Sequence, residues 1–217
     1  MTRRNISSAL FAQLWNKRFS RHFQTLVSYT YGKVIDDVSD FDFPLGPQDP
    51  TSPGQERSLS TFDLRQRLSI SAVIESPFKT PTLANFVLAP IVTARSGFPF
   101  NVTTGIDINQ DSNNNDRPLA VGRNTGRGPN YFTVDLRLAR RFGFGKDGRH
   151  SVEMIFDSFN LLNRVNFREV NGNTGGALLP LSDVRVKGDP GVKSTSFRGF
   201  ISANEPRVIQ LALKLNF

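Results

Sequence analysis

The chain ends with Val208-Ile209-Gln210-Leu211-Ala212-Leu213-Lys214-Leu215-Asn216-Phe217, the stretch that decides its fold. Counting back from Phe217, the residues Leu215, Leu213, Leu211 and Ile209 share one face, and polar or small residues share the other. Alternation with period two predicts a β-strand with one apolar face. A half-buried strand of a soluble sandwich would show the same alternation. Two features count against a soluble sandwich: the strand ends on the last residue of the chain, and that residue is Phe.

The same period recurs along the whole chain. Strands are expected at about 8–19, 23–33, 64–75, 84–95, 132–141 and 152–159, which with the C-terminal strand makes about seven long strands. Ile70, Ile74, Leu136 and Leu138 fall on the apolar faces of their strands. In the first strand Leu10, Ala12 and Leu14 lie on one side. Pro90 predicts an irregular or weakly paired position, because proline has no N–H to donate.

The connections alternate in length. Those at 20–22, 76–83 and 143–148 are short, and those at 34–61, 96–130 and 161–205 are long and polar. Short turns at one end and long loops at the other are typical of outer-membrane barrels, whose strands are apolar outside and polar inside. The sequence therefore predicts an all-β, antiparallel up-and-down meander, part of a transmembrane β-barrel. About seven or eight strands of a larger barrel should form an open curved sheet.

Composition excludes several classes of protein. The 217 residues are 38% hydrophobic, with a mean hydropathy of −0.31, and no apolar run is long enough to span a bilayer as a helix. Cysteine is absent, which excludes disulfides and thiolate chemistry, and the two histidines are far apart. The net charge is +8, but the basic residues are spread along the chain. A cationic strand face lining an aqueous channel explains this charge better than nucleic-acid binding, which we do not expect.

Two motifs are candidates for nucleotide or catalytic chemistry. Residues 143–148 match G-x-G-x-x-G, but the following segment alternates as a strand, and a dinucleotide fingerprint requires a helix there. A hairpin turn is the better interpretation. The acidic loop with Asp36, Asp37, Asp40 and Asp42 could contact a ligand or a cation, but we interpret it as a solvated surface loop. No Ser/His/Asp arrangement stands out, so we expect no enzyme and no organic cofactor.

One loop has the spacing of a cation site. Asp107, Asn109 and Asp111 present oxygen ligands at alternating positions, as a hard cation such as Ca²⁺ requires. The match to an EF-hand loop is partial, because Ser112 replaces the turn glycine and no Glu stands at the twelfth position. The alternative is an Asn/Asp-rich solvated turn.

Several strings together resemble the C-terminal barrel of Oar-like TonB-dependent transporters. The resemblance covers nearly the whole chain and is specific in combination. The strings are Ala9-Leu10 through Asn16-Lys17-Arg18-Phe19, Ser28-Tyr29-Thr30-Tyr31-x-Lys33-x-Ile35-Asp36-Asp37, Ser96-Gly97-x-Pro99-Phe100, Asn115-Asp116-Arg117-Pro118, Arg123-Asn124, Asp135-Leu136-Arg137-Leu138 with Arg141-Phe142, residues 159–167, and 206–217.

The resemblance implies an outer-membrane barrel of about 22 strands with an N-terminal plug, energised by TonB. It also implies an assembly signal at Phe217, Leu215, Leu213, Leu211 and Ile209, read by the barrel-assembly machinery. The other expected partners are outer-membrane lipid and the N-terminal strands and plug of the same protein. The transported substrate stays open.

In departure from the family pattern, we expect residues 1–217 to hold no signal peptide, no TonB-contacting segment, no plug and no carboxypeptidase-like N-terminal domain. Residues 1–217 are therefore expected to be the C-terminal segment of a transporter barrel, a fragment that does not transport alone. The alternatives are a small autonomous outer-membrane barrel acting as an adhesin or scaffold and, more weakly, an outer-membrane enzyme.

Overall fold

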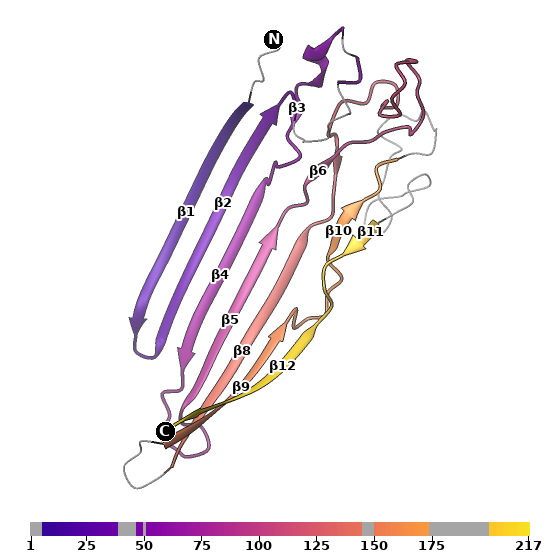
Figure 1. Cartoon of the computed structure of the whole chain (residues 1–217). Helices are drawn as coiled ribbons and strands as arrows, with labels where there is room; N and C mark the ends of the chain where they lie inside the picture. Colours follow the sequence, from indigo (N-terminus) through magenta and orange to yellow (C-terminus); the bar gives the residue numbers. More distant parts are fainter. Residues whose placement is uncertain (1–5, 39–46, 50, 145–149, 174–199) are drawn as a thin grey trace.

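The computed structural model describes residues 6–38, 47–49, 51–144, 150–173 and 200–217. Within these ranges the main sheet has eight strands in the order β1-β2-β4-β5-β8-β9-β12, with the short β3 paired to β2. Figure 1 shows the seven long strands side by side, running in alternating directions. Their bounds are β1 (Ile6–Ser20), β2 (Phe23–Asp36), β4 (Gln66–Glu75), β5 (Phe86–Arg95), β8 (Tyr131–Phe144), β9 (His150–Phe159) and β12 (Val208–Asn216).

The predicted strands are all present, and every neighbouring pair is antiparallel. The all-β meander expected from the alternation is thus confirmed. Several strands reach further than their apolar pattern indicated: β2 continues to Asp36 and β8 to Phe144. β12 ends at Asn216, so Phe217 follows the ladder directly. None of the described helices is both long and apolar enough to cross a membrane.

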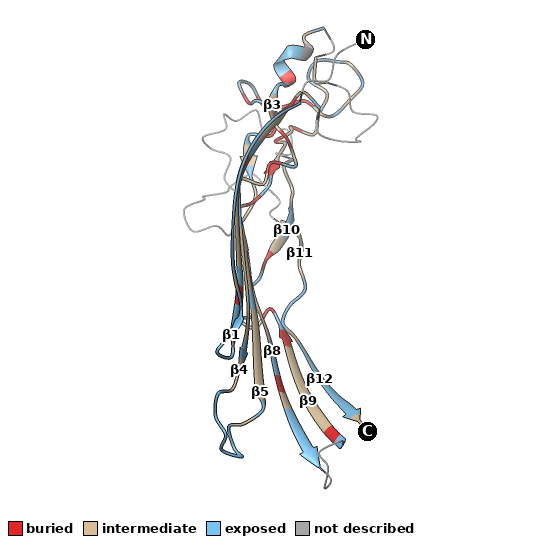
Figure 2. Ribbon diagram, turned by 90° about the vertical axis from the view of Figure 1, so that its left-hand side faces the viewer, coloured by how far each residue is buried: buried red, intermediate tan, exposed pale blue. Residues whose placement is uncertain are grey.

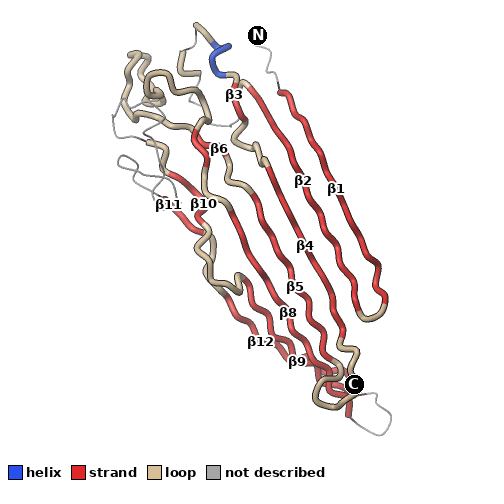
Figure 3. The backbone as a smooth tube through the Cα atoms, turned by 180° about the vertical axis from the view of Figure 1, so that it is seen from behind, coloured by secondary structure: helices blue, strands red, loops and turns tan. Residues whose placement is uncertain are grey.

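The two ends of the sheet differ, as the loop lengths predicted. Figures 1 and 3 show the turns β1–β2 and β4–β5 at the same end as the C-terminus, and the long connections at the other end. The β1–β2 turn is tight because Arg21 and His22 both have positive φ, 50° and 65°, the geometry of a type I′ turn. The long connections carry the short elements β3 (Ser58–Leu59), β6 (Pro99–Phe100), β7 (Gly126–Arg127), β10 (Phe167–Val170), β11 (Phe200–Ala203) and the 3₁₀ helix η1 (Pro53–Glu56).

Pro90 lies in the middle of β5, and its effect on pairing is one-sided. On the β8 side the register is continuous through Pro90, which faces Leu136. On the β4 side the paired residues jump from Ser71–Ile91 to Ile74–Leu88. The missing N–H of proline accounts for this interruption, and the weak pairing predicted for Pro90 is found on one edge of its strand.

The glycine-rich motif at 143–148 connects two strands. Gly143 lies within β8, and the segment after the motif is the strand β9, paired with β8 from His150 onward. The strand-to-helix context of a dinucleotide site is therefore absent here. Gly145 and Gly148, and Asp40 and Asp42 of the acidic loop, lie outside the described residues.

The sheet is open. β1 and β12 are its two edges and do not pair with each other in the described structure. Figure 2 shows the strands nearly edge-on as one bowed layer. The buried hydrophobic side chains of the described residues are few: Val102 and Val121 in the loops, and Ala139 in β8. A single curved sheet without a closed edge gives no support to the small autonomous barrel.

We predict that the isolated 217-residue chain does not form a closed barrel. Closing seven long strands on themselves would require a much tighter curvature than a wide wall has. Two unpaired edges and an apolar face would otherwise meet water, which promotes association. Size-exclusion chromatography with light scattering should find aggregates in buffer and open or oligomeric species in detergent. A monomeric, protease-resistant barrel in detergent would contradict this expectation.

Candidate functional site

One face of the sheet is apolar from edge to edge. Antiparallel partners point to the same side of a sheet, so the register shows which side chains share a face. One continuous row runs across six strands and contains Leu211, Phe156, Leu138, Leu88, Ile74 and Phe23. A second row contains Trp15, Val27, Ile70, Val92 and Val134. The register also puts Leu136, Leu213 and Leu215 on this apolar face, as the sequence predicted.

The opposite face is polar. Arg137 Nε and Nη2 donate to the two carboxylate oxygens of Asp157, at 2.7 and 2.8 Å. Glu153 lies between Arg141 and Lys214 in the register. A further row consists of hydroxyl side chains from four neighbouring strands: Ser28, Ser69, Thr93 and Thr133. Charged and hydroxyl groups suit a water-lined lumen.

β1 departs from this division. Leu10 and Leu14 pair with Gly32 and Ser28, which places them on the polar face. Phe11 and Trp15 lie on the apolar face, and all four side chains are more than half exposed. β1 is therefore apolar on both sides, so its alternation alone did not reveal which side belongs to the lumen.

Cations pair with aromatic rings at both ends of the apolar face. Near the short turns, Arg140 lies 4.6 Å from the ring centroids of both Phe86 and Phe142. Near the loops, Arg164 lies 5.9 Å from the centroid of Phe132. Phe132 and Phe142 are about 34 Å apart along the strand. Barrel strands are tilted by about 35–45° from the membrane normal, so the distance between the two rings along that normal is shorter. It is close to the height of roughly 25 Å of the apolar band that aromatic girdles flank in outer-membrane barrels.

At the loop end, a buried ion-pair cluster joins two long loops. Arg117 forms a bidentate pair with Glu56 at 2.9 and 2.7 Å, and both side chains are almost wholly buried. Arg123 donates from Nε to the backbone oxygen of Glu56 at 2.7 Å, and from Nη2 to the backbone oxygen and carboxylate of Asp36. The cluster binds the first long loop to the second, because its partners are 61 to 87 residues apart.

A second carboxylate, Asp63, fixes the top of the sheet. It is fully buried and accepts a hydrogen bond from the backbone N–H of Val34 at 2.8 Å. Arg65 and Arg127 lie 3.1 and 3.2 Å from its other oxygen. One buried carboxylate thus joins the end of β2, the approach to β4, and β7.

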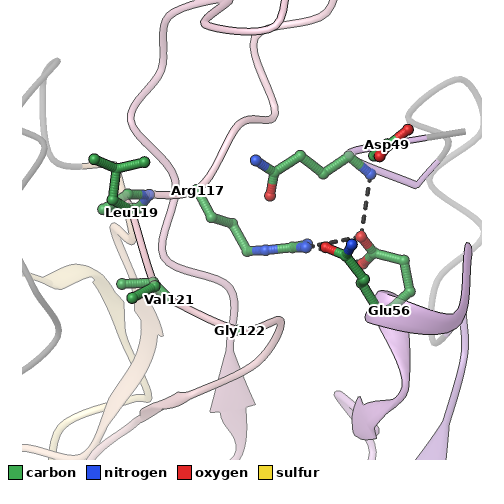
Figure 4. Close-up of a pocket in the computed structure, with 10 residues that line it drawn as sticks. Asp49, Glu56, Arg117, Leu119, Val121 and Gly122 are labelled. Atoms are coloured by element: carbon green, nitrogen blue, oxygen red, sulfur yellow. Dashed lines mark hydrogen bonds and ion pairs between the residues drawn. The ribbon is translucent and has the colours of Figure 1, made fainter. Parts of the chain in front are cut away.

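A cavity of about 430 Å³ lies beside the Glu56–Arg117 pair (Figure 4). Gln48, Asp49 and Gln55 line it from the first loop, and residues 117–122 line it from the second. A hydrogen bond from the Thr51 hydroxyl lowers the pKa of Asp49. The carboxylate of Glu56 and the guanidinium of Arg117, which also line the cavity, are hydrogen-bonded to each other. The described residues that line the cavity include no histidine, serine or cysteine.

The structure gathers the predicted Asp/Asn loop into one turn. Asp107 accepts hydrogen bonds from the backbone N–H groups of Asp111 and Ser112, and Asn109 Oδ1 accepts from that of Asp111. Asp116, which is fully buried, accepts from the N–H groups of Ile108 and Asn109. Among the described residues no three His, Asp or Glu side chains form a metal-binding group.

Sequence reasoning missed Glu56 and Asp63 as structural residues. Arg117 and Arg123 appeared only within strings that resemble a family. Asp36 was interpreted as part of a solvated acidic loop, and this interpretation is wrong for Asp36, which is only 3% exposed and accepts hydrogen bonds from Arg123. The pairing of Glu56 with Arg117 joins residues 61 positions apart, and no local pattern predicts such a partner. A single acidic residue in a polar loop gives no signal of burial.

Comparison with known proteins gives the family. The model described as "Outer membrane beta barrel domain" matches residues 8–122 and 119–210. These matches cover almost the whole chain, so the chain belongs to this family of outer-membrane β-barrel domains. It is therefore a barrel wall of the bacterial outer membrane. Searches of curated proteins and of solved structures returned no match.

We predict opposite tolerance to charge at adjacent residues of β12. Leu213 lies on the apolar face and Ala212 on the polar face. Leu213→Arg should destabilise the wall by about 2–4 kcal/mol, because a guanidinium near the bilayer midplane must leave water. Ala212→Arg is the matched control and should cost much less. Unfolding titrations of the assembled barrel in lipid vesicles measure both values, and equal costs at the two positions would contradict the assignment of faces.

Proposed function

We propose that the chain forms part of the wall and rim of an Oar-like TonB-dependent outer-membrane transporter. In this role it supplies transmembrane strands, extracellular loops and an assembly signal, and it performs no chemistry of its own. The observation that carries the proposal is the open sheet of seven long strands, with edges β1 and β12 unpaired in the described structure. A membrane sheet requires closure, so these edges call for further strands.

Several of the strings that carry the family resemblance contain residues that hold the loop end of the sheet together. Asn160 and Asn166, within the string at 159–167, fix the loop end of the strand pair β8–β9. The backbone N–H of Asn160 donates to Asp135 at 2.8 Å. The side chain of Asn166 exchanges hydrogen bonds of 2.9 and 3.0 Å with the backbone of Phe132. Arg117, Arg123 and Asp36 build the ion-pair cluster. These quoted strings thus contribute residues that hold the rim together.

The proposal assigns a partner to each surface. The apolar face contacts outer-membrane lipid, and the two edges pair with strands from the N-terminal part of the same protein. The polar face borders the lumen, where the plug would lie. The barrel-assembly machinery would read Phe217, which is 91% exposed, together with Leu215, Leu213, Leu211 and Ile209. Nucleic acid is not among the proposed partners, because the basic residues form no separate patch in the sequence.

The gene region immediately before the codon for Met1 tests this function. We expect an in-frame sequence that encodes further barrel strands and a plug. A signal peptide directly before Met1 would contradict the proposal and favour a small barrel. The parent protein should then lose energised solute uptake in cells without TonB. Uptake that is unchanged in such cells would also contradict the proposal.

We predict that deletion of Phe217 impairs assembly of the whole parent protein. The last strand must pair with the first to remove the exposed edge, and by family resemblance the terminal aromatic residue directs this step. Heat-modifiable migration on gels and outer-membrane yield measure assembly. Phe217→Tyr keeps an aromatic terminus and should assemble normally. Yield and heat modifiability unchanged by the deletion would count against the assembly signal.

We also propose weak Ca²⁺ binding by the loop, with Asp107, Asn109 and Asp111 as ligands. Asp111 Oδ2 and Asp116 Oδ1 are buried without a hydrogen-bond partner, and a buried carboxylate is costly unless it is neutralised. Calorimetry on the full chain in detergent should detect binding at millimolar Ca²⁺ that Asp111→Ala abolishes. Asp49→Ala, in the neighbouring loop, is the control. No heat at millimolar Ca²⁺ would leave the turn as a solvated structure.

A further inference from the structure

Two arginines face each other directly on the polar side of the sheet. Arg67 of β4 is the register partner of Arg95 of β5, so both side chains leave the same face. Directly opposed residues in an antiparallel pair have Cβ atoms about 4.5–5.5 Å apart, and like charges in such positions repel. This pair places two positive charges side by side on the polar face, where an oxyanion could neutralise both.

Neither guanidinium has an acidic partner in the described part of the chain. Arg67 and Arg95 take part in no salt bridge there, and their remaining neighbours in the row are Thr30 and Tyr131. The other cations of this face differ. Arg137 is paired with Asp157, and Glu153 stands opposite both Arg141 and Lys214. At the loop end above, Asp63 is already shared by Arg65 and Arg127.

The surroundings hold the pair in place and add donors. The guanidinium of Arg95 lies 4.6 Å from the ring centroid of Tyr131 and 5.2 Å from that of Phe98. Stacking on aromatic faces fixes its plane while leaving its N–H groups free to donate at the edge. One step below on the same face is the row of hydroxyls, Ser28, Ser69, Thr93 and Thr133.

We propose that Arg67 and Arg95 form an anion-binding site on the lumenal wall, which takes a carboxylate or phosphate group. Two adjacent guanidiniums can each donate two hydrogen bonds to an oxyanion. The oxyanion belongs either to a solute in the lumen or to an acidic side chain from another part of the parent protein. Only the location of the site in a lumen rests on the proposed function, because anion binding by the chain itself requires no TonB.

The test measures binding of inorganic phosphate to the full chain in detergent micelles by calorimetry. We expect saturable binding that is weakened at least about tenfold in Arg67→Gln and in Arg95→Gln, since each removes charge-assisted hydrogen bonds. Arg137→Gln is the matched control, because it removes a cation on the same face that already has a partner, and it should bind as the unchanged chain does. Far-UV circular dichroism verifies the sheet, and Arg67→Lys, which keeps the charge, should bind with an intermediate affinity.

The same titration on the intact parent protein distinguishes the two sources of the anion. Binding by both the chain and the parent identifies a solute site. Binding by the chain alone identifies a site already occupied by an acidic side chain, and Arg67→Gln should then lower the melting temperature of the parent. The proposal is overturned if the chain shows no saturable phosphate binding, or if Arg137→Gln weakens binding as much as Arg67→Gln. Neither result depends on which transporter class the parent belongs to.

Discussion

Backbone hydrogen bonding is the constraint on which this structure depends. In hydrocarbon an unpaired N–H or C=O costs several kcal/mol, so a sheet can cross a bilayer only when every strand is paired on both sides. β2, β4, β5, β8 and β9 meet this requirement within the chain, whereas β1 and β12 each have one free edge in the described structure. The unpaired edges are the two surfaces where further strands are needed. Pro90 is tolerated within β5 because it interrupts pairing on one side only.

Once the ladders are fixed, the pleat separates the chemistry of the two faces. A shift of one residue would exchange them, because successive side chains point to opposite sides. The row from Leu211 to Phe23 and the row of hydroxyls at Ser28 to Thr133 both result from one register held across the sheet. The apolar face has no second protein layer over it among the described residues, and lipid takes the place that a hydrophobic core has in a soluble protein. This explains why the described residues include so few buried hydrophobic side chains.

Local period and loop length could be interpreted from the sequence, whereas the register between distant segments could not. Alternation at Leu211, Leu213 and Leu215 predicts a strand whatever its neighbours are. The opposition of Arg67 and Arg95 requires knowledge of how β4 and β5 align, and the Glu56–Arg117 pair requires two loops to fold against each other. In β1 the alternation does not identify the lumenal face, because the apolar residues Leu10 and Trp15 lie on opposite faces. For the Asp/Asn loop, the spacing predicted a Ca²⁺ site or, as the alternative, a solvated turn, and the structure adds the burial of Asp116.

The wall and the rim are stabilised by different forces, and this separates their roles. The wall depends on ladders and lipid, whereas the rim is in water and has only a small apolar cluster around Val102 and Val121 among its described residues. Its long loops are held instead by buried charges. Removing one partner of such a pair typically costs about 3–5 kcal/mol, because the other charge stays buried and unpaired. Loss of the Glu56 carboxylate would remove the bidentate partner of Arg117, whereas Arg123 would keep Asp36 and the backbone oxygen of Glu56. The first two long loops therefore behave as one unit above the sheet, and this arrangement fixes the cavity between them.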